Sequence, residues 1–158
     1  MMQPQSLAAT EGTSLWFLGT LLLVKATSET TKGAFGLFEQ LAPASFATPY
    51  HVHHAEDEAF YILEGEVTYI FDGVHKTVGP GAYVFAPRDV PHGYRVSDSG
   101  PARLLFMNTP AGAERFFIEL SEPAASLTLP PPTAPDIPKL IALASTFKMD
   151  ILGPLPGF

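Results

Sequence analysis

Short apolar runs, many of them alternating with polar residues, follow one another along the chain as far as residue 110. Alternation with a period of two is typical of half-buried β-strands, and short continuous apolar runs between turns are typical of buried ones. Turn-forming residues separate the runs, as at Phe71-Asp72-Gly73 and Gly79-Pro80-Gly81. The predicted strands lie near Trp16–Leu18, Thr20–Lys25, Phe35–Leu41, Tyr50–His53, Ala59–Glu64, Val67–Phe71, Val74–Val78, Tyr83–Phe85, His92–Val96 and Ala102–Thr109. Strands this short and regular predict an all-β antiparallel sandwich or barrel.

After residue 110 the pattern becomes helical and rich in proline. Thr109-Pro110 is suited to the N-cap and first turn of a helix that continues over Ala113–Leu120. Leu129–Pro132 predicts an extended spacer, because consecutive prolines exclude a helix. Asp136 is suited to cap a second helix over Pro138–Lys148. The apolar face of that second helix consists of Leu140, Ile141, Leu143, Ala144 and Phe147.

We therefore expect one domain, with a β-barrel over residues 1–110 and a helical, proline-rich extension over residues 111–158 packed on it. A chain of 158 residues, of which 46% are hydrophobic and 16% charged, is long enough for one core and too short for two ordinary domains. The apolar face of the second helix could cover the mouth of the barrel or dock on a second subunit. The pattern leaves both arrangements open.

Composition excludes several kinds of site. The chain has no cysteine, so disulfides and thiolate ligands are excluded, and any metal would be held by nitrogen and oxygen. The net charge is −7, and no cluster of lysines and arginines is present to neutralise phosphates. The sequence therefore predicts no nucleic-acid partner.

The apolar run Leu15–Val24 is the one stretch that resembles an export or membrane signal. No positive charge precedes it, since Glu11 is the only charged residue before position 15. A spanning helix needs about 20 apolar residues, roughly twice the length of this run. We expect buried strands over Leu15–Lys25, interrupted or bulged near Gly19. No membrane partner is predicted, and the expected location is the cytoplasm.

His51, His53 and Glu58 form the most informative pattern in the chain. The two histidines are two positions apart, so an extended backbone projects them from the same face. Glu58 opens the apolar run Ala59–Leu63, where a buried carboxylate needs a partner or a cation. Two imidazoles and a carboxylate are a ligand set for iron, manganese, nickel, copper or zinc, with positions left open for substrate.

These residues, together with His92, resemble the cupin family. The first cupin motif places His-x-His before a glutamate and a glycine, positions filled here by His51, His53, Glu58 and Gly65. In the second motif, Gly81, Pro87 and His92 match. Three positions depart from the pattern: Ser45 and Asp89 stand where the family has glycine, and Val96 stands where it has asparagine. The resemblance implies a jelly-roll version of the β-barrel and one divalent transition metal bound by His51, His53, Glu58 and His92.

The remaining polar residues of this region are interpreted as ordinary ones. His54 falls on the opposite strand face from His51 and His53, and His75 lies in a turn. Glu56 and Asp57 are interpreted as a solvated turn that could tune the entrance electrostatically.

Alternation from the ligand positions also predicts the walls of the pocket. Phe60, Ile62 and Tyr94 lie an even number of residues from a ligand on the same strand and are expected to point inward, with Leu104 and Phe106 completing the lining. Such walls suit a small, largely apolar substrate.

Two classes of function are compatible with these residues. The stretch His51–Glu66 is similar to small single-domain cupins related to quercetin dioxygenases, which implies oxidation of a small phenolic or flavonol-like substrate by dioxygen. In that scheme Glu58 binds the metal and also acts as a catalytic base. The alternative is a non-catalytic small-molecule-binding cupin or a metal-dependent isomerase, because fold does not fix function. The family resemblance and the apolar surface of both terminal regions also predict a homodimer.

Overall fold

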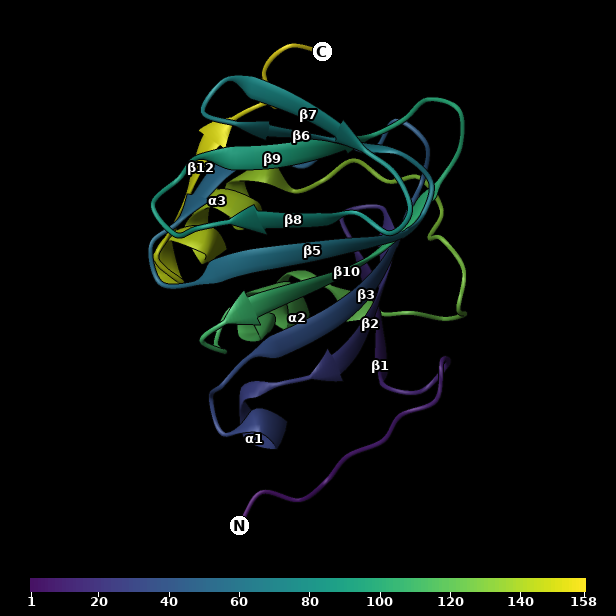
Figure 1. The fold of residues 1–158 in the computed structure, drawn as a ribbon, viewed down its shortest axis with the longest axis vertical. Helices are drawn as coiled ribbons and strands as arrows, with labels where there is room; N and C mark the ends of the chain where they lie inside the picture. The colour runs from purple at the N-terminus through teal and green to yellow at the C-terminus, as the bar shows by residue number, and fades with distance from the viewer.

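The computed structural model describes residues 1–158 and consists of two antiparallel β-sheets packed face to face (Figure 1). The larger sheet has the strand order β11 (Glu122–Pro123), β1 (Thr13–Phe17), β2 (Thr20–Ala26), β3 (Gly36–Ala42), β10 (Ala102–Thr109), β5 (Asp57–Glu64) and β8 (Tyr83–Ala86). The smaller sheet has the order β12 (Met149–Gly153), β4 (Tyr50–His53), β9 (His92–Val96), β6 (Val67–Phe71) and β7 (Val74–Val78). This arrangement is the predicted antiparallel jelly roll.

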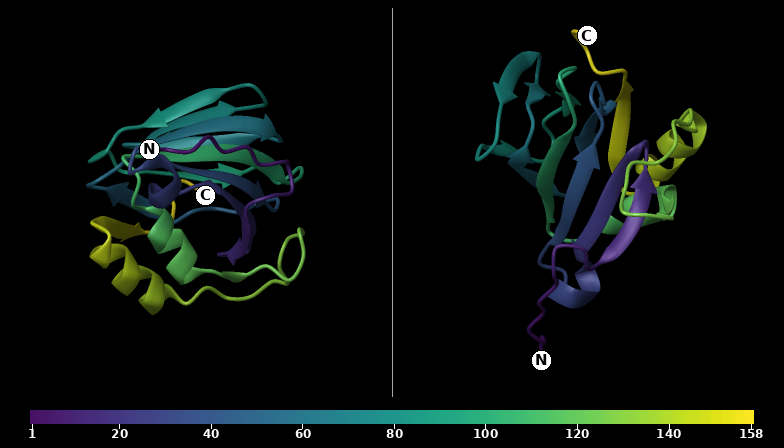
Figure 2. Two further views of the ribbon diagram at one scale, coloured as in Figure 1. Left: turned by 90° about the horizontal axis from the view of Figure 1, so that it is seen from below. Right: turned by 90° about the vertical axis from the view of Figure 1, so that its right-hand side faces the viewer.

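Three short helices accompany the sheets: α1 (Ser28–Thr31), α2 (Glu114–Leu120) and α3 (Ile137–Thr146). The two C-terminal helices lie beside each other against one side of the sandwich in both views of Figure 2. Phe116 of α2 and Phe147 after α3 place their ring centroids 6.1 Å apart. No helix of the structure is both long and apolar enough to cross a lipid bilayer.

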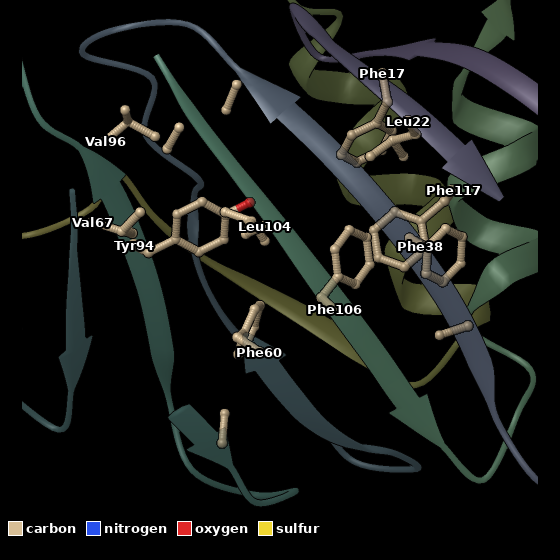
Figure 3. Close-up of a cluster of buried hydrophobic side chains, with 14 of the residues drawn as sticks. Phe17, Leu22, Phe38, Phe60, Val67, Tyr94, Val96, Leu104, Phe106 and Phe117 are labelled. Carbon is tan, nitrogen blue, oxygen red and sulfur yellow. The ribbon is translucent and has the colours of Figure 1, made fainter. Parts of the chain in front are cut away.

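The core lies between the sheets, because alternate residues of each strand point inward. In β10 the inward residues are Ala102, Leu104, Phe106 and Asn108. Phe106 lies opposite Phe38 of β3 on one side and Phe60 of β5 on the other. Figure 3 shows Phe38, Phe106 and Phe117 close together, with Phe60 and Tyr94 further along the same core.

The N-terminal apolar run forms a hairpin. Leu18 and Gly19 both have positive φ, +46° and +81°, and Phe17 pairs with Thr20 across the turn. Two consecutive positive φ values are typical of a tight two-residue hairpin turn. The interruption predicted near Gly19 is therefore this turn, and the residues on either side of it are paired strands.

Several boundaries near the C-terminus differ from the predictions. Thr109 is the last residue of β10 and does not cap a helix, since α2 begins at Glu114 with Ala113 as its N-cap. Asp136 does cap α3, with Oδ1 accepting a hydrogen bond of 3.0 Å from the backbone N–H of Lys139. The extension also contributes a strand to each sheet, because β11 pairs with β1 and β12 pairs with β4.

Candidate metal centre

Strand pairing brings four potential ligands together across the two sheets. His51 on β4 lies directly opposite His92 on β9, and His53 follows two positions later on the same face of β4. Glu58 comes from the facing sheet, on β5, where it pairs with Asn108 of β10 and Ala86 of β8. Strand pairing thus holds the three imidazoles on the smaller sheet and the carboxylate on the larger one, on opposite sides of the core.

The four side chains converge on a single point. Glu58 Oε2 lies 2.8 Å from His92 Nε2, 3.4 Å from His53 Nε2 and 3.9 Å from His51 Nε2. One ligand atom from each of the four residues lies within 4.8 Å of every other. The structure therefore brings together all four residues predicted as ligands, and this cluster could hold a metal ion.

Backbone carbonyl groups fix the orientation of two of the rings. His51 Nδ1 lies 2.9 Å from the carbonyl oxygen of Pro49, and His92 Nδ1 lies 2.9 Å from that of Val90. A carbonyl oxygen can only accept, so each Nδ1 carries the hydrogen and each Nε2 presents its lone pair to the cluster. This tautomer is the one that a metal-binding imidazole requires.

Two further polar side chains, which the sequence patterns did not identify, support the cluster. Asn108 Nδ2 donates a hydrogen bond of 2.9 Å to Glu58 Oε1, the oxygen that faces away from the imidazoles. Glu56 Oε2 lies 3.6 Å from His53 Nδ1, and both atoms are buried without a hydrogen-bond partner. The interpretation of Glu56 as part of a solvated turn is wrong, because the turn after β4 folds its side chain inward and leaves Glu56 only 6% exposed.

The side chains of the adjacent residues Glu56 and Asp57 point in opposite directions, Glu56 inward just before β5 and Asp57 outward as the first residue of β5. Asp57 points outward and receives three hydrogen bonds from Arg88, one from its backbone N–H and two from its guanidinium. A buried asparagine could have been suspected from the sequence, since Asn108 follows Ala102, Leu104 and Phe106 at the alternate, apolar positions of β10. The position that the family pattern gives to asparagine holds Val96, which is fully buried in the core.

The four residues of the cluster shift one another's pKa values, so that the carboxylate is ionised while one imidazole is protonated. Burial lowers the pKa of His51, even though Glu58 contacts its ring. Burial would also lower the pKa of His53, but the charges of Glu58 and Glu56 raise it to about 9. Desolvation favours the protonated form of Glu58, yet the three imidazoles hold the pKa of Glu58 well below its usual range. The cluster therefore contains an ionised carboxylate and a bound proton at neutral pH, and an incoming cation would replace that proton.

Three of the four ligand residues, His51, His53 and Glu58, line one side of an apolar cavity of about 60 Å³. Of the predicted wall residues, Phe60, Tyr94 and Phe106 line it, whereas Ile62 and Leu104 are fully buried in the core away from it. Phe116, Phe117 and Leu140 of the C-terminal helices complete the aromatic and aliphatic lining. Burial raises the pKa of Tyr94, so its hydroxyl stays neutral and donates to Gln40 Oε1.

The remaining histidines lie outside this cavity. His54 is exposed and bridges two surface carboxylates, with Nδ1 2.6 Å from Asp89 and Nε2 3.0 Å from Asp150. The ring of His75 stacks on that of Phe158.

The donor set fits a first-row divalent metal. Its atoms are imidazole nitrogens and a carboxylate oxygen, which iron, manganese, nickel, copper and zinc all accept. A cation would also balance the charge of the buried Glu58 carboxylate that the three imidazoles surround.

Comparison with known proteins agrees with this geometry. Residues 37–108 match the family model described as "Cupin domain". The chain is 30% identical over 120 residues to quercetin 2,3-dioxygenase of Bacillus subtilis (strain 168), a match that covers 76% of this chain and 35% of that protein. The chain thus spans about a third of the length of this curated relative.

Two solved structures share the fold. An RmlC-like cupin from Shewanella frigidimarina NCIMB 400 has a TM-score of 0.60 at 20% identity, covering 73% of this chain and 99% of that one. The polyketide cyclase RemF from Streptomyces resistomycificus has a TM-score of 0.59 at 23% identity, covering 68% of this chain and 80% of that one. The domain match, the two antiparallel sheets and the His, His, Glu, His cluster together identify residues 37–108 of this chain as a cupin domain.

Proposed function

We propose that the protein is a metal-dependent dioxygenase that acts on a small phenolic substrate, with His51, His53, Glu58 and His92 as its metal ligands. The observation that carries the proposal is the position of a convergent three-imidazole, one-carboxylate cluster on the wall of an apolar, aromatic cavity. The similarity to quercetin 2,3-dioxygenase supports oxygen chemistry in particular.

A redox-active metal bound here would supply Lewis acidity and a change of oxidation state to a coordinated phenol and dioxygen. The protein's own contribution is the arrangement around it. The backbone carbonyls of Pro49 and Val90 orient two of the rings, and Asn108 holds the outer oxygen of Glu58. Phe60 and Phe106 offer flat apolar walls to a substrate ring and keep water from it.

Glu58 is proposed as the base that accepts the proton of the substrate hydroxyl. It is ionised at neutral pH because the imidazoles lower its pKa, so it can accept a proton without a preceding ionisation step. Burial acts in the opposite direction and favours the neutral acid. When Oε2 loses contact with an imidazole, burial therefore raises the pKa of Glu58 and the carboxylate more readily accepts a proton. A general base requires this property.

The proposal is tested by metal analysis and an oxygen-consumption screen on one preparation. The purified chain is loaded in turn with iron, manganese, nickel and copper, and oxygen uptake is recorded with catechol and with flavonols. We expect one bound metal per chain and metal-dependent uptake with a phenolic compound. The double variant His53→Ala with His92→Ala should lose both the metal and the activity, whereas His75→Ala, which removes an exposed histidine of β7, should keep both.

Retention of metal by the double variant would contradict the assignment of the ligands. Binding of phenols to the metal-loaded protein without oxygen uptake under any of the metals would contradict the dioxygenase proposal and favour a binding module.

We also propose that the protein pairs as a homodimer. The support is a group of outward-facing aromatic residues on the edge of the larger sheet, Tyr61, Tyr83 and Phe85, which we call the β5–β8 aromatic patch. Exposed aromatic residues gathered on one face are typical of an interface.

A further inference from the structure

A second and larger hollow adjoins the small cavity at the ligand cluster. This outer hollow has a volume of about 690 Å³ and lies between the segment Phe46–Pro49, α3 and β12. Figure 1 shows α3 beside β12, at the edge of the smaller sheet. The two spaces adjoin each other, because they share the lining residues Leu18, Phe46, Thr48, Pro49, Leu140 and Ile151.

The walls of the outer hollow are apolar and mainly aliphatic. Ile137 and Ile141 of α3 and Leu152 of β12 belong to these walls, yet they are 45%, 48% and 51% exposed. None of the lining residues carries a charge. The single side-chain hydroxyl among them, that of Thr48, already accepts a hydrogen bond from the backbone N–H of Tyr94.

The inner cavity alone is too small for a phenolic ring. An apolar protein cavity of about 150 Å³ is known to hold benzene, and the inner cavity measures about 60 Å³. A phenol whose oxygens reach the ligand cluster therefore needs further space, and the adjoining outer hollow is where the rest of its body can lie.

We propose that the substrate is a phenol with an uncharged hydrocarbon substituent, which lies in the hollow between α3, β12 and the Phe46–Pro49 segment. The inference rests on the proposed function for the phenolic head and deepens it by naming the rest of the molecule. Most of the hollow's apolar surface comes from residues after position 136, beyond the stretch that matches the cupin domain model. The C-terminal extension would thus select the substrate.

The chemistry of the walls decides between a hydrocarbon and a polyhydroxylated substituent. A hydroxyl buried against these residues would lose its hydrogen bonds to water, and the walls offer no side-chain partner except the Thr48 hydroxyl, so its burial costs free energy. A methylene group gains by the same transfer, up to about fourfold in affinity for each group that is fully buried. The hollow therefore favours an alkylated phenol over a flavonol with several hydroxyl groups on its outer rings.

The test measures binding of catechol, 3-hexylcatechol and 4-hexylcatechol to the zinc-loaded protein by calorimetry. Zinc has no redox chemistry, so binding can be followed without turnover. We expect at least one hexylcatechol to bind on the order of tenfold more tightly than catechol, or better. Equal affinities for catechol and both hexylcatechols would overturn the inference.

Two variants locate the effect, one on each side of the hollow. Ile141→Asp on α3 and Leu152→Asp on β12 each place a charge at an exposed wall position, so the fold should tolerate them. Both should abolish the gain from the hexyl chain, so that the ratio of hexylcatechol affinity to catechol affinity falls to about one. Ala142→Asp introduces the same charge at an exposed position of α3 outside the hollow and should retain the gain. A gain that survives both wall variants would also overturn the inference.

A separate probe distinguishes failure of the inference from failure of the proposed function. N-phenyl-1-naphthylamine is uncharged and apolar, has no metal-binding phenol, and fluoresces when bound in an apolar site. If no catechol binds but the probe binds to the parent and not to Ile141→Asp, the phenolic function fails while the apolar site stands. If neither the catechols nor the probe bind, both proposals fail.

Discussion

At the scale of single residues, Glu58 has a separate partner for each carboxylate oxygen. Oε1 accepts from Asn108 and Oε2 faces the imidazoles. In Glu58→Gln an amide group must replace one oxygen, so either the imidazoles or Asn108 face an N–H₂ group in place of an acceptor. We expect the fold and part of the bound metal to remain, while turnover per bound metal falls on the order of 10²-fold or more, as is typical when a general base is removed.

Metal content and oxygen uptake must be measured on the same preparation of Glu58→Gln, because loss of metal alone also lowers the rate. If the variant holds a full complement of metal and turns over at the parent rate, Glu58 has only a structural role. The proton acceptor would then be water or the substrate itself.

Glu56 provides a second prediction at this scale. Its buried carboxylate lies 3.6 Å from His53 Nδ1, where an acceptor fixes the ring tautomer and strengthens Nε2 as a ligand. Glu56→Gln keeps the size of the side chain and removes its charge, so metal affinity should fall about 10- to 100-fold. Competition with a chelator measures the affinity, and Glu66→Gln, at an exposed position after β5, is the matched control. Unchanged affinity in Glu56→Gln would show that His53 needs no such support.

Spacing along the chain predicted His51, His53 and Glu58 because strand geometry is local, whereas His92, on a distant strand, was predicted from the cupin resemblance. It could not predict Glu56, whose orientation depends on how the turn after β4 folds. Two departures from the family pattern are explained by backbone conformation: Ser45 and Asp89 have positive φ, +66° and +65°, where the family has glycine. Their side chains bond to Asp98 and His54 respectively, which helps to hold a conformation that usually requires glycine.

At the scale of elements, Glu114 ties the N-terminal helix to the C-terminal one. Its Oε1 accepts a hydrogen bond of 2.7 Å from the backbone N–H of Ser28 in α1, and its Oε2 accepts one of 2.6 Å from that of Gly112 before α2. Glu114→Gln cannot accept both, so one partly buried N–H loses its partner. We expect a loss of about 1–3 kcal/mol in the free energy of unfolding at neutral pH.

The pH dependence of this effect has a definite sign. Burial raises the pKa of Glu114, but the hydrogen bonds from Ser28 and Gly112 outweigh it and lower the pKa below its ordinary value. A carboxyl whose folded-state pKa is lowered adds stability above its unfolded pKa, and that stability disappears as pH falls through the folded-state value. Urea unfolding should show the difference between parent and Glu114→Gln shrinking in acid. Glu119→Gln, exposed on the same helix, should match the parent throughout, and a difference for Glu114→Gln that is independent of pH would contradict the charge-based account.

The elements that sequence patterns missed are short or depend on distant partners. Strand β12 alternates buried Met149 with exposed Asp150, but a helix directly precedes it and its partner β4 lies about a hundred positions earlier in the chain. Strand β11 is defined only by its pairing with β1. Helix α1 has a capping box between Thr27 and Thr30, a local signal that four helical residues are too few to reinforce. The long strands of the barrel, by contrast, were predictable because each buries a full alternating face.

At the scale of the whole molecule, the surface available for pairing differs from the one expected. The N-terminal apolar run is buried in its own sheet, with Leu21, Leu22 and Leu23 each at most 5% exposed. Helix α3 packs on the same chain and buries Leu140 and Ala144. The β5–β8 aromatic patch remains, with Tyr61, Tyr83 and Phe85 45%, 67% and 47% exposed. Strand β8 is also the edge of its sheet, so its backbone can accept a partner strand.

We therefore predict that the homodimer forms through the β5–β8 aromatic patch. Tyr83 lies opposite Tyr61, and Phe85 follows on the same outward face, so charges at positions 83 and 85 would stand at the centre of the interface. Sedimentation equilibrium at micromolar concentration should give twice the chain mass of 17.0 kDa for the parent and 17.0 kDa for Tyr83→Glu with Phe85→Glu. Val74→Glu changes an apolar residue that is 66% exposed on β7 of the other sheet and should remain dimeric.

A parent particle of 17.0 kDa would refute the dimer. A dimer that Val74→Glu separates and the double variant does not would place the interface on the smaller sheet, where the outer strand β7 also presents a free edge.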